Sequence, residues 1–163
     1  MIVQSIRKRI IMKVVPYSPK YKNDFIEMNK AWISEMFKME PEDERELGNI
    51  EPYIEKGGQI FFSLNEKEEV TACCMIAPRD DGDWEIMKFA ARGMYTGTGA
   101  GSACLKACID YAKKLHLPKI IVFSNRKCTH ALSLYRKYGF KEIPVDKKRF
   151  PFERADIAFE MML

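Results

Sequence analysis

The spacing of apolar residues divides the first third of the chain into one strand and several helices. The apolar run at residues 12–15 predicts a short strand, because a proline follows it immediately. Apolar side chains then recur every three or four positions through residues 21–36, which predicts an amphipathic helix. Residues 39–58 are acidic and interrupted by prolines and glycines, so we expect one or two short helices there.

The rest of the chain alternates between strands and helices. Residues 59–78 hold two apolar runs around a charged turn, which predicts a β-hairpin, and residues 83–91 follow as a third strand. The later predicted elements are a helix over residues 102–115, a strand over 119–124, a helix from residue 129 closed by Gly139, and two strands over 141–145 and 155–163.

This order of elements predicts an α/β fold with a mixed, mostly antiparallel central sheet flanked by helices. No linker, repeat or low-complexity segment divides the sequence, so we expect its 163 residues to form a single domain. Residues 1–11 precede the first predicted strand. They are expected to be a flexible or additional N-terminal segment.

Charge and composition exclude several classes of function. The formal net charge is +4, but basic residues alternate with acids and form no dense patch, so we expect no nucleic-acid partner. No apolar run approaches the roughly 18 residues of a membrane span, and basic residues at positions 7–9 interrupt the apolar N-terminus. We therefore expect no membrane association, no secretory signal and a cytoplasmic protein.

Five cysteines and two histidines offer little for a metal site. The number of cysteines is odd and no C-x-x-C motif occurs. Cys104 and Cys108 lie one helical turn apart, but the sequence shows no further ligands to complete a site with them. We expect the cysteines to be small core residues in a reducing compartment, and we expect no metal cofactor.

The segment "YTGTGAGS", residues 95–102, places three glycines directly before a predicted helix. A P-loop would need a lysine after the glycines, and a dinucleotide-binding loop would need an acidic residue about twenty positions later; neither is present. A strand–glycine–helix junction still presents N–H groups at the positive end of a helix dipole, which suits an anion. The alternative is a tight turn whose glycines only permit close packing, and the loop alone leaves both open.

Four segments taken together resemble the GNAT acetyltransferase family, which binds acetyl-coenzyme A. They are the strand "WEIMKFAA", the glycine loop with its helix, the strand "KIIVFSN" and the helix "ALSLYRKYGF", in the order of the family. The similarity covers nearly the whole chain from Met12 onward. It implies a GNAT-like fold and acetyl-coenzyme A as co-substrate.

The resemblance implies how the coenzyme is held. The pantetheine arm would pair with the backbone of Phe89 and Ala91, in a gap between the third strand of the meander and the strand at 119–124. Asn125 would bond the amides of the arm, or it is only a turn or helix-cap residue. Thr96 stands where the family usually has Arg or Gln, so a charged donor is missing. The expected pyrophosphate ligands are the backbone amides of Gly97, Thr98, Gly99 and Gly101, together with Thr96 and Ser102.

Two residues are candidates for proton transfer. Tyr135 matches the family tyrosine that returns a proton to the leaving thiolate, which a phenol of pKa about 10 can do; otherwise it is a buried ring beside Leu132 and Leu134. Glu85 is a candidate for taking a proton from the incoming ammonium, or it pairs with Lys88 or with a neighbouring strand. The residues expected to line the acceptor pocket are Trp32, Phe37 and Glu40, although Trp32 also fits simple core packing.

We therefore expect an acetyl-CoA-dependent N-acetyltransferase that acetylates a primary amine of a small molecule or peptide by direct attack. An acyl-enzyme on Cys128 is not expected, because no base is placed to activate it. The alternative is a non-catalytic acyl-CoA-binding regulator with the same fold, which Thr96 favours. The acidic residues at 39–52 either attract a cationic substrate or form a solvated helix face. Either a monomer or a homodimer is compatible with the sequence.

Overall fold

The computed structural model describes residues 12–93, 96–150 and 152–163, and the expected N-terminal segment at 1–11 lies outside this part of the chain. The described strands are β1 (Lys13–Pro16), β2 (Gln59–Leu64), β3 (Val70–Pro78), β4 (Trp84–Ala91), β5 (Lys119–Ser124), β6 (Lys141–Ile143) and β7 (Ile157–Met162). The described helices are the 3-10 helix η1 (Pro19–Tyr21), α1 (Lys22–Met36), α2 (Pro41–Leu47), α3 (Glu51–Glu55), α4 (Ala100–Lys114) and α5 (Thr129–Lys137).

The strands form one mixed sheet in the order β1-β2-β3-β4-β5-β7-β6. Every neighbouring pair is antiparallel except β4 and β5, which run parallel and are joined through α4. The structure therefore confirms the expected α/β fold with a mostly antiparallel central sheet flanked by helices.

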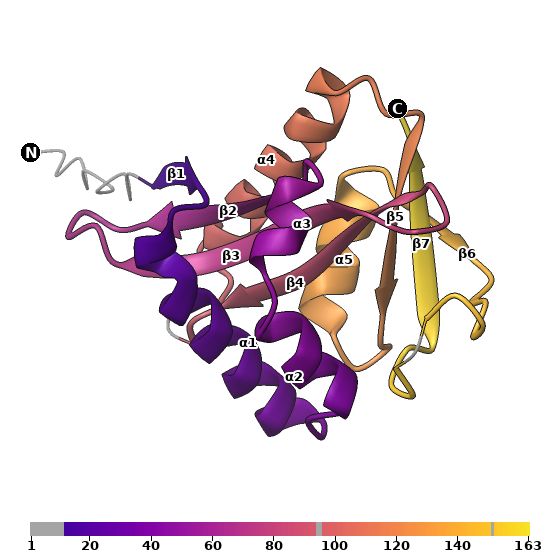
Figure 1. Cartoon of the computed structure of the whole chain (residues 1–163), viewed down its shortest axis with the longest axis horizontal. Coiled ribbons are helices and arrows are strands. Elements are labelled where there is room, and N and C mark those ends of the chain that lie inside the picture. The colour runs from indigo at the N-terminus through magenta and orange to yellow at the C-terminus, as the bar shows by residue number, and fades with distance from the viewer. Residues whose placement is uncertain (1–11, 94–95, 151) are drawn as a thin grey trace, which may run out of the picture.

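Helices cover both faces of the sheet, and each face has its own core (Figure 1). The α1–α3 core contains Phe25, Leu47 and Phe62, packed below the first four strands. The α4/α5 core on the opposite face contains Leu105 and Phe159 among its buried side chains. Alternate residues of the central strands point into one core or the other, which explains why β3 reads as a continuous apolar run.

Several predicted boundaries move by a few residues, for identifiable reasons. Pro41 and Pro52 do not interrupt helices but stand in the first turns of α2 and α3, where the missing N–H of proline has no helical partner to lose. Helix α4 begins at Ala100, two residues earlier than expected, because Gly99 with φ 93° serves as its N-cap. Strand β6 ends at Ile143 rather than at residue 145.

Strand β4 contains an irregularity that determines the shape of the sheet. Lys88 has φ 53°, in the left-handed region, and the pairing with β3 shifts register between Cys73 and Met75. Such a bulge bends the strand and changes the direction of the side chains that follow it. Strand β4 pairs with β5 only at Glu85 and Ile86, so the two strands separate beyond the bulge.

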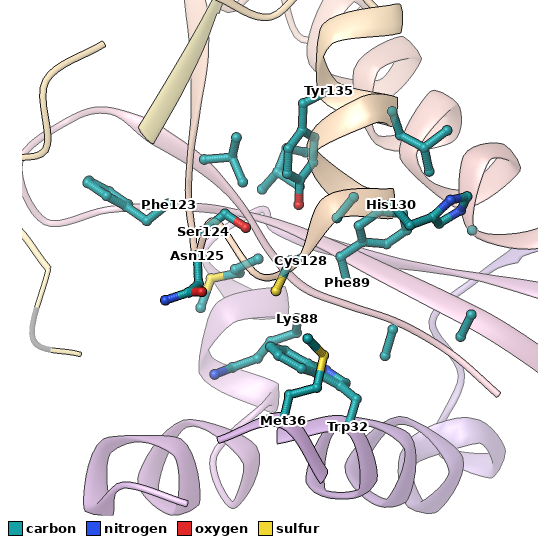
Figure 2. A pocket seen from close by; sticks show the side chains of 18 of the residues that line it. Trp32, Met36, Lys88, Phe89, Phe123, Ser124, Asn125, Cys128, His130 and Tyr135 are labelled. Atoms are coloured by element: carbon teal, nitrogen blue, oxygen red, sulfur yellow. The ribbon is translucent and has the colours of Figure 1, made fainter. Parts of the chain in front are cut away.

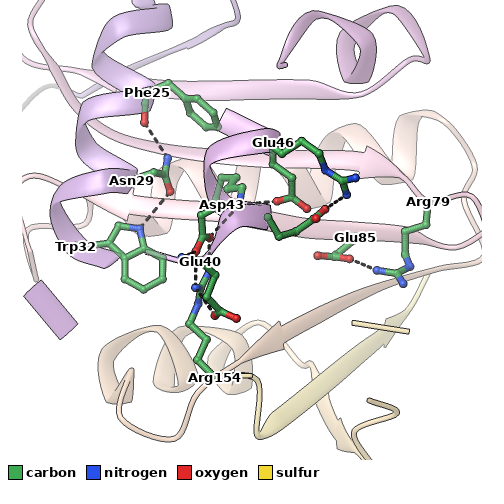
Figure 3. Close-up of polar contacts among 12 residues, drawn as sticks. Phe25, Asn29, Trp32, Glu40, Asp43, Glu46, Arg79, Glu85 and Arg154 are labelled. Carbon is green, nitrogen blue, oxygen red and sulfur yellow. Dashed lines mark hydrogen bonds and ion pairs between the residues drawn. The ribbon is translucent and has the colours of Figure 1, made fainter. Parts of the chain in front are cut away.

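A buried ionic cluster connects α2 to the segment before β7. Both oxygens of the fully buried Asp43 accept hydrogen bonds from the Arg154 guanidinium, at 2.5 and 2.7 Å, and Glu40 accepts another at 3.0 Å (Figure 3). The Lys88 ammonium lies 2.6 Å from the Glu46 carboxylate and 3.8 Å from Asp43. Although burial raises the pKa of Asp43, the bonds from Arg154 and from the Glu40 N–H outweigh it and lower that pKa below its usual value.

We predict that Asp43→Ala lowers the free energy of unfolding by about 3–5 kcal/mol, because it breaks the buried pair with Arg154 at both carboxylate oxygens and leaves that cation with Glu40 alone. The matched control is Glu42→Ala on the same helix, which removes an ion pair with Arg45, a side chain that is 74% exposed. That control should cost less than about 1 kcal/mol. Chemical denaturation measures both, and equal losses would contradict a structural role for the cluster.

Candidate active site

A cavity of about 570 Å³ opens where β4 and β5 separate, and residues from both faces of the sheet line it. Figure 2 shows Tyr135 reaching into it from α5, and Trp32 and Met36 reaching toward it from α1 on the opposite side. The cavity therefore passes through the sheet. The predicted site residues on its wall are Trp32, Phe37, Glu85, Phe89, Ala91, Thr96, Gly97, Gly99, Gly101, Ser102, Asn125 and Tyr135.

The edge of β4 beyond Ile86 has no strand partner on the β5 side within the described chain. The Arg92 N–H donates to Thr71 on the β3 side, at 2.9 Å. Backbone groups of successive strand residues point to opposite edges, so those of Ala91 and Phe89 face the gap. They can therefore pair with an extended molecule in the cavity as an added strand does.

The glycine loop ends at the uncapped N-terminus of α4. The first hydrogen bond of the helix runs from the Ala103 N–H to the Gly99 oxygen, at 3.0 Å, so the N–H groups of the preceding turn have no helical acceptor. Gly99 has no side chain to cap them, and φ 93° at this position favours glycine. A Cβ on Gly101 would lie 3.1 Å from the Phe89 ring, so this glycine permits the close approach of α4 to β4.

Among the predicted loop ligands, two differ from the others. Thr98 lies outside the cavity wall, although its neighbours Gly97 and Gly99 line it. The Ser102 hydroxyl is on the wall, but it shares a hydrogen bond of 2.7 Å with the Tyr138 hydroxyl. An anion at the helix N-terminus would thus be met mainly by backbone N–H groups.

Tyr135 has a buried ring and a hydroxyl group that reaches the cavity, so its position agrees with both interpretations of the sequence. Its ring is buried, with centroids 6.1 Å from Phe89, 5.7 Å from Phe140 and 5.6 Å from Phe159. Its hydroxyl nevertheless points into the cavity (Figure 2). Burial raises the pKa of Tyr135 well above its usual value, so the hydroxyl remains protonated at neutral pH and can act as a proton donor.

Asn125 lies on the wall but its side chain serves the turn after β5. Its amide nitrogen donates to the Arg154 oxygen at 2.7 Å, and its carbonyl oxygen accepts from the Lys127 N–H at 2.8 Å. The side-chain oxygen of Asn125 therefore serves the turn, which was one of the two interpretations of this residue. The amide group has a second hydrogen, which is its remaining donor for a bound molecule.

Glu85 is buried and forms an ion pair with Arg79, the residue that follows β3. Its partner is thus the neighbouring strand end and not Lys88, which binds Glu46 instead. Burial raises the pKa of the Glu85 carboxyl to about 7, and the attraction of Arg79 offsets only part of this rise. Arg79 also lies 5.4 Å over the Phe123 ring.

The α1 side of the cavity is aromatic. Trp32 and Phe37 form an edge-to-face pair 6.2 Å apart, and the Trp32 indole donates a hydrogen bond to Asn29 (Figure 3). Trp32 therefore lines the cavity and is not a fully buried core residue. Glu40 does not reach the wall, because it accepts bonds from Arg154 and from the Glu153 N–H.

Sequence reasoning missed the contributions of the acidic segment and of the loop before β7. Asp43 and Glu46 bind Arg154 and Lys88 inside the protein, and Glu46 also lies on the cavity wall. Other acids of the segment, Glu44 and Glu51, are exposed. Phe150 and Phe152 also line the cavity. The "RFPF" run at residues 149–152 was an available signal, because two aromatics in a polar loop seldom stay exposed.

Cysteines and acidic residues provide no alternative chemistry in the described part of the chain. Cys73, Cys74, Cys104 and Cys108 are free and buried, and the half-buried Cys128 lines the cavity. Burial raises the pKa of the Cys128 thiol, which opposes its use as a nucleophile. No cluster of three or more potential metal ligands occurs among the described residues. None of the described helices combines the length and apolar character needed to cross a membrane.

Comparison with known proteins places the chain in a family. Residues 25–140, well over half of the sequence, match the model of the acetyltransferase (GNAT) family. The chain therefore belongs to the GNAT acetyltransferase family. No curated protein matched the chain.

Solved structures show the same fold. The chain is similar to a GNAT acetyltransferase from Staphylococcus aureus, with a TM-score of 0.82, 21% identity and coverage of 93% of this chain and 99% of that one. It is also similar to the PaiA N-acetyltransferase of Thermoplasma acidophilum in complex with coenzyme A (TM-score 0.73, 14% identity, coverage 94% and 100%). A GNAT acetyltransferase of Elizabethkingia anophelis with acetyl-CoA bound is similar too (TM-score 0.58, 21% identity, coverage 93% and 98%).

We predict that Glu85 makes the stability depend on pH. The folded chain keeps a proton on Glu85 that the unfolded chain releases, so its contribution is full below pH about 4.5 and is lost as the pH rises through about 7. The unfolding free energy of wild type should therefore fall relative to that of Glu85→Gln over this window, by on the order of 3 kcal/mol. Denaturant titrations at several pH values measure it.

The control for this prediction is Glu142→Gln, which changes a carboxylate that is 47% exposed and paired with Arg126. The change of stability with pH relative to wild type should be larger for Glu85→Gln than for this exposed control. A constant difference from wild type for Glu85→Gln would show that Glu85 ionises at its ordinary pKa.

Proposed function

We propose that this protein is an acetyl-CoA-dependent N-acetyltransferase that acetylates a primary amine of a small molecule or peptide by direct attack. The observation that carries the proposal is the cavity through the sheet. On one side it has an unpaired strand edge and an uncapped helix N-terminus, and it contains the Tyr135 hydroxyl. The strand edge suits an extended arm that carries amides, and the helix N-terminus suits a pyrophosphate. The Tyr135 hydroxyl suits a reacting thioester.

Different parts of the chain bind different parts of the coenzyme. Backbone N–H groups at Gly97, Gly99 and Gly101 bind the pyrophosphate, and the β4 backbone at Phe89 and Ala91 binds the arm. Bound acetyl-CoA supplies an activated acyl group. Ser102 and Asn125 add side-chain donors only as far as their bonds to Tyr138 and Arg154 allow.

Two residues move protons in the proposed mechanism. Tyr135 donates the proton of its hydroxyl, which points into the cavity, to the leaving thiolate. Glu85, with a pKa of about 7, takes a proton from the incoming ammonium, directly or through water, so that a neutral amine attacks. Trp32 and Phe37 line the side from which the amine enters.

A second candidate function is a non-catalytic acyl-CoA-binding regulator with the same fold. Thr96 favours it, because this wall residue offers a hydroxyl where the family usually has a charged donor. For either function we propose a monomer or homodimer in the cytoplasm, where the free cysteines remain reduced.

We predict that the charge at position 96 controls coenzyme affinity. Thr96→Arg should tighten binding of coenzyme A about fivefold, and Thr96→Glu should weaken it by a similar factor, because the side chain faces a bound pyrophosphate. The two variants share one backbone position and serve as controls for each other. Calorimetry at two salt concentrations measures them, and equal affinities would remove residue 96 from the phosphate site.

The decisive experiment is the release of thiol from acetyl-CoA in the presence of a panel of primary amines, with the acetylated product identified by mass. We predict that Tyr135→Phe lowers kcat by about 10²- to 10⁴-fold and leaves the Kd for acetyl-CoA unchanged, because it removes the proton donor and keeps the ring. Tyr111→Phe is the control, since its hydroxyl bonds the Gly57 oxygen away from the cavity. Coenzyme binding without acetylation of any amine would favour the regulator.

A further inference from the structure

Two groups of aromatic side chains flank the part of the cavity that faces α1 and α2. One group is Trp32 and Phe37, from the end of α1. The other is Phe123, from the end of β5, with Phe150 and Phe152 from the loop before β7. Phe123 and Phe150 are stacked, with centroids 4.5 Å apart, and Phe150 lies 4.7 Å from Phe152.

Both aromatic groups lie on the face of the sheet opposite α5. Val122 packs into the α4/α5 core, so the next residue of β5, Phe123, points to the other face. Trp32 packs against the α1–α3 core. The coenzyme-facing features, Gly99 and Tyr135, belong to the α4/α5 side. The aromatic groups therefore border the approach that remains for the acceptor.

Charged side chains of both signs line this approach. Among the described wall residues the carboxylates are Glu46 and Glu85, and each is bound to a cation, Lys88 and Arg79 respectively. The cations of the wall are Lys88, Lys127, Lys137 and Arg154. Of these, Lys88 is bound to Glu46, and Arg154 is bound to Asp43. An acceptor with several positive charges would therefore find both wall carboxylates next to cations of the protein, although the buried Glu46 Oε2 accepts no hydrogen bond. It would also meet the further cations Lys127 and Lys137.

The Trp32 ring is held in place before any acceptor binds. Its indole nitrogen donates to the Asn29 oxygen at 3.1 Å, and the amide nitrogen of the fully buried Asn29 donates to the Phe25 oxygen at 2.9 Å (Figure 3). A ring that is fixed in advance loses little conformational entropy when a ligand packs on it. This suits Trp32 to be a contact surface for an apolar ligand.

We infer that the acceptor is a monoamine whose amino group is attached to an apolar, aromatic body. The inference rests on the proposed function and specifies its substrate class. The ring of the acceptor lies between Trp32 and Phe37 on one side and Phe123 and Phe150 on the other. Burial of an aromatic ring among aromatic side chains supplies affinity through apolar area and ring–ring contact, while a single amino group reaches the gap between β4 and β5.

The first test compares 2-phenylethylamine with spermidine and kanamycin in the thiol-release assay. We expect kcat/KM for 2-phenylethylamine to exceed that of either polycation at least tenfold. Equal or better turnover of spermidine or kanamycin would overturn the inference and leave the N-acetyltransferase function intact.

A binding measurement without catalysis distinguishes the proposed substrate class from the proposed N-acetyltransferase function. Calorimetry with protein saturated by coenzyme A, titrated with 2-phenylethylamine, should show binding, and spermidine should bind at least tenfold more weakly. Binding of the aromatic amine without acetylation would support the aromatic subsite and contradict the enzyme. Absence of such binding in a protein that acetylates other amines would overturn the subsite alone.

Variants locate the subsite. Trp32→Ala should raise KM for 2-phenylethylamine at least fivefold more than it raises KM for methylamine, and Trp32→Phe should restore most of the loss. Phe150→Ala gives an independent test should the tryptophan variant fold poorly. Phe61→Ala is the matched control, because Phe61 pairs with Tyr111 at 5.9 Å and lies outside the cavity wall. Equal effects of Trp32→Ala and Phe61→Ala would contradict the assignment.

Discussion

The separation of β4 from β5 is the constraint on which the site depends. A parallel pair that remained bonded along its whole length would close the sheet and leave no passage between its two faces. Here the left-handed backbone at Lys88 bends β4 after only two paired positions, at Glu85 and Ile86. The gap leaves one strand edge without its usual partner, and the protein places the uncapped start of α4 beside it. Unpaired backbone groups of β4 are unfavourable in the free protein, and they lie where a bound molecule can form hydrogen bonds with them.

The buried ionic cluster around Asp43 stabilises the bend of β4 at Lys88. Lys88 stands at the irregular position itself, and its ammonium binds Glu46 and approaches Asp43. Arg154, bound to Asp43, comes from the segment that carries the aromatic residues of the cavity. The same few charges therefore fix the bulge, helix α2 and one wall of the cavity. Burying so many charges is unfavourable unless all are paired, so these three elements keep their relative positions together or lose them together.

Much of the fold could be predicted from local patterns. The order of strands and helices followed from hydrophobic spacing, and the glycine loop and the "LYRKYGF" helix located the coenzyme side through family resemblance. The bulge at Lys88 could not be predicted, because a lysine with positive φ is held there by tertiary contacts that local propensity does not contain. The same holds for Glu40 and Asp43, whose partner Arg154 lies more than a hundred residues away. The spacing of residues in the sequence predicts contacts within one helix or strand. It does not predict which charged side chains pair when they meet only after folding.

The distribution of thiols has a practical consequence for chemical labelling. Four cysteines are sealed in the two cores, and burial holds the pKa of the Cys74 thiol well above its usual value and raises that of Cys104 to about 12. A maleimide or haloacetamide reagent reacts with thiolate, so these four sites become reactive only when the fold opens. Cys128 alone combines partial exposure with a place on the cavity wall. A fluorophore or spin label should therefore attach first at Cys128, at a rate that its own raised pKa lowers and that occupancy of the cavity would lower further.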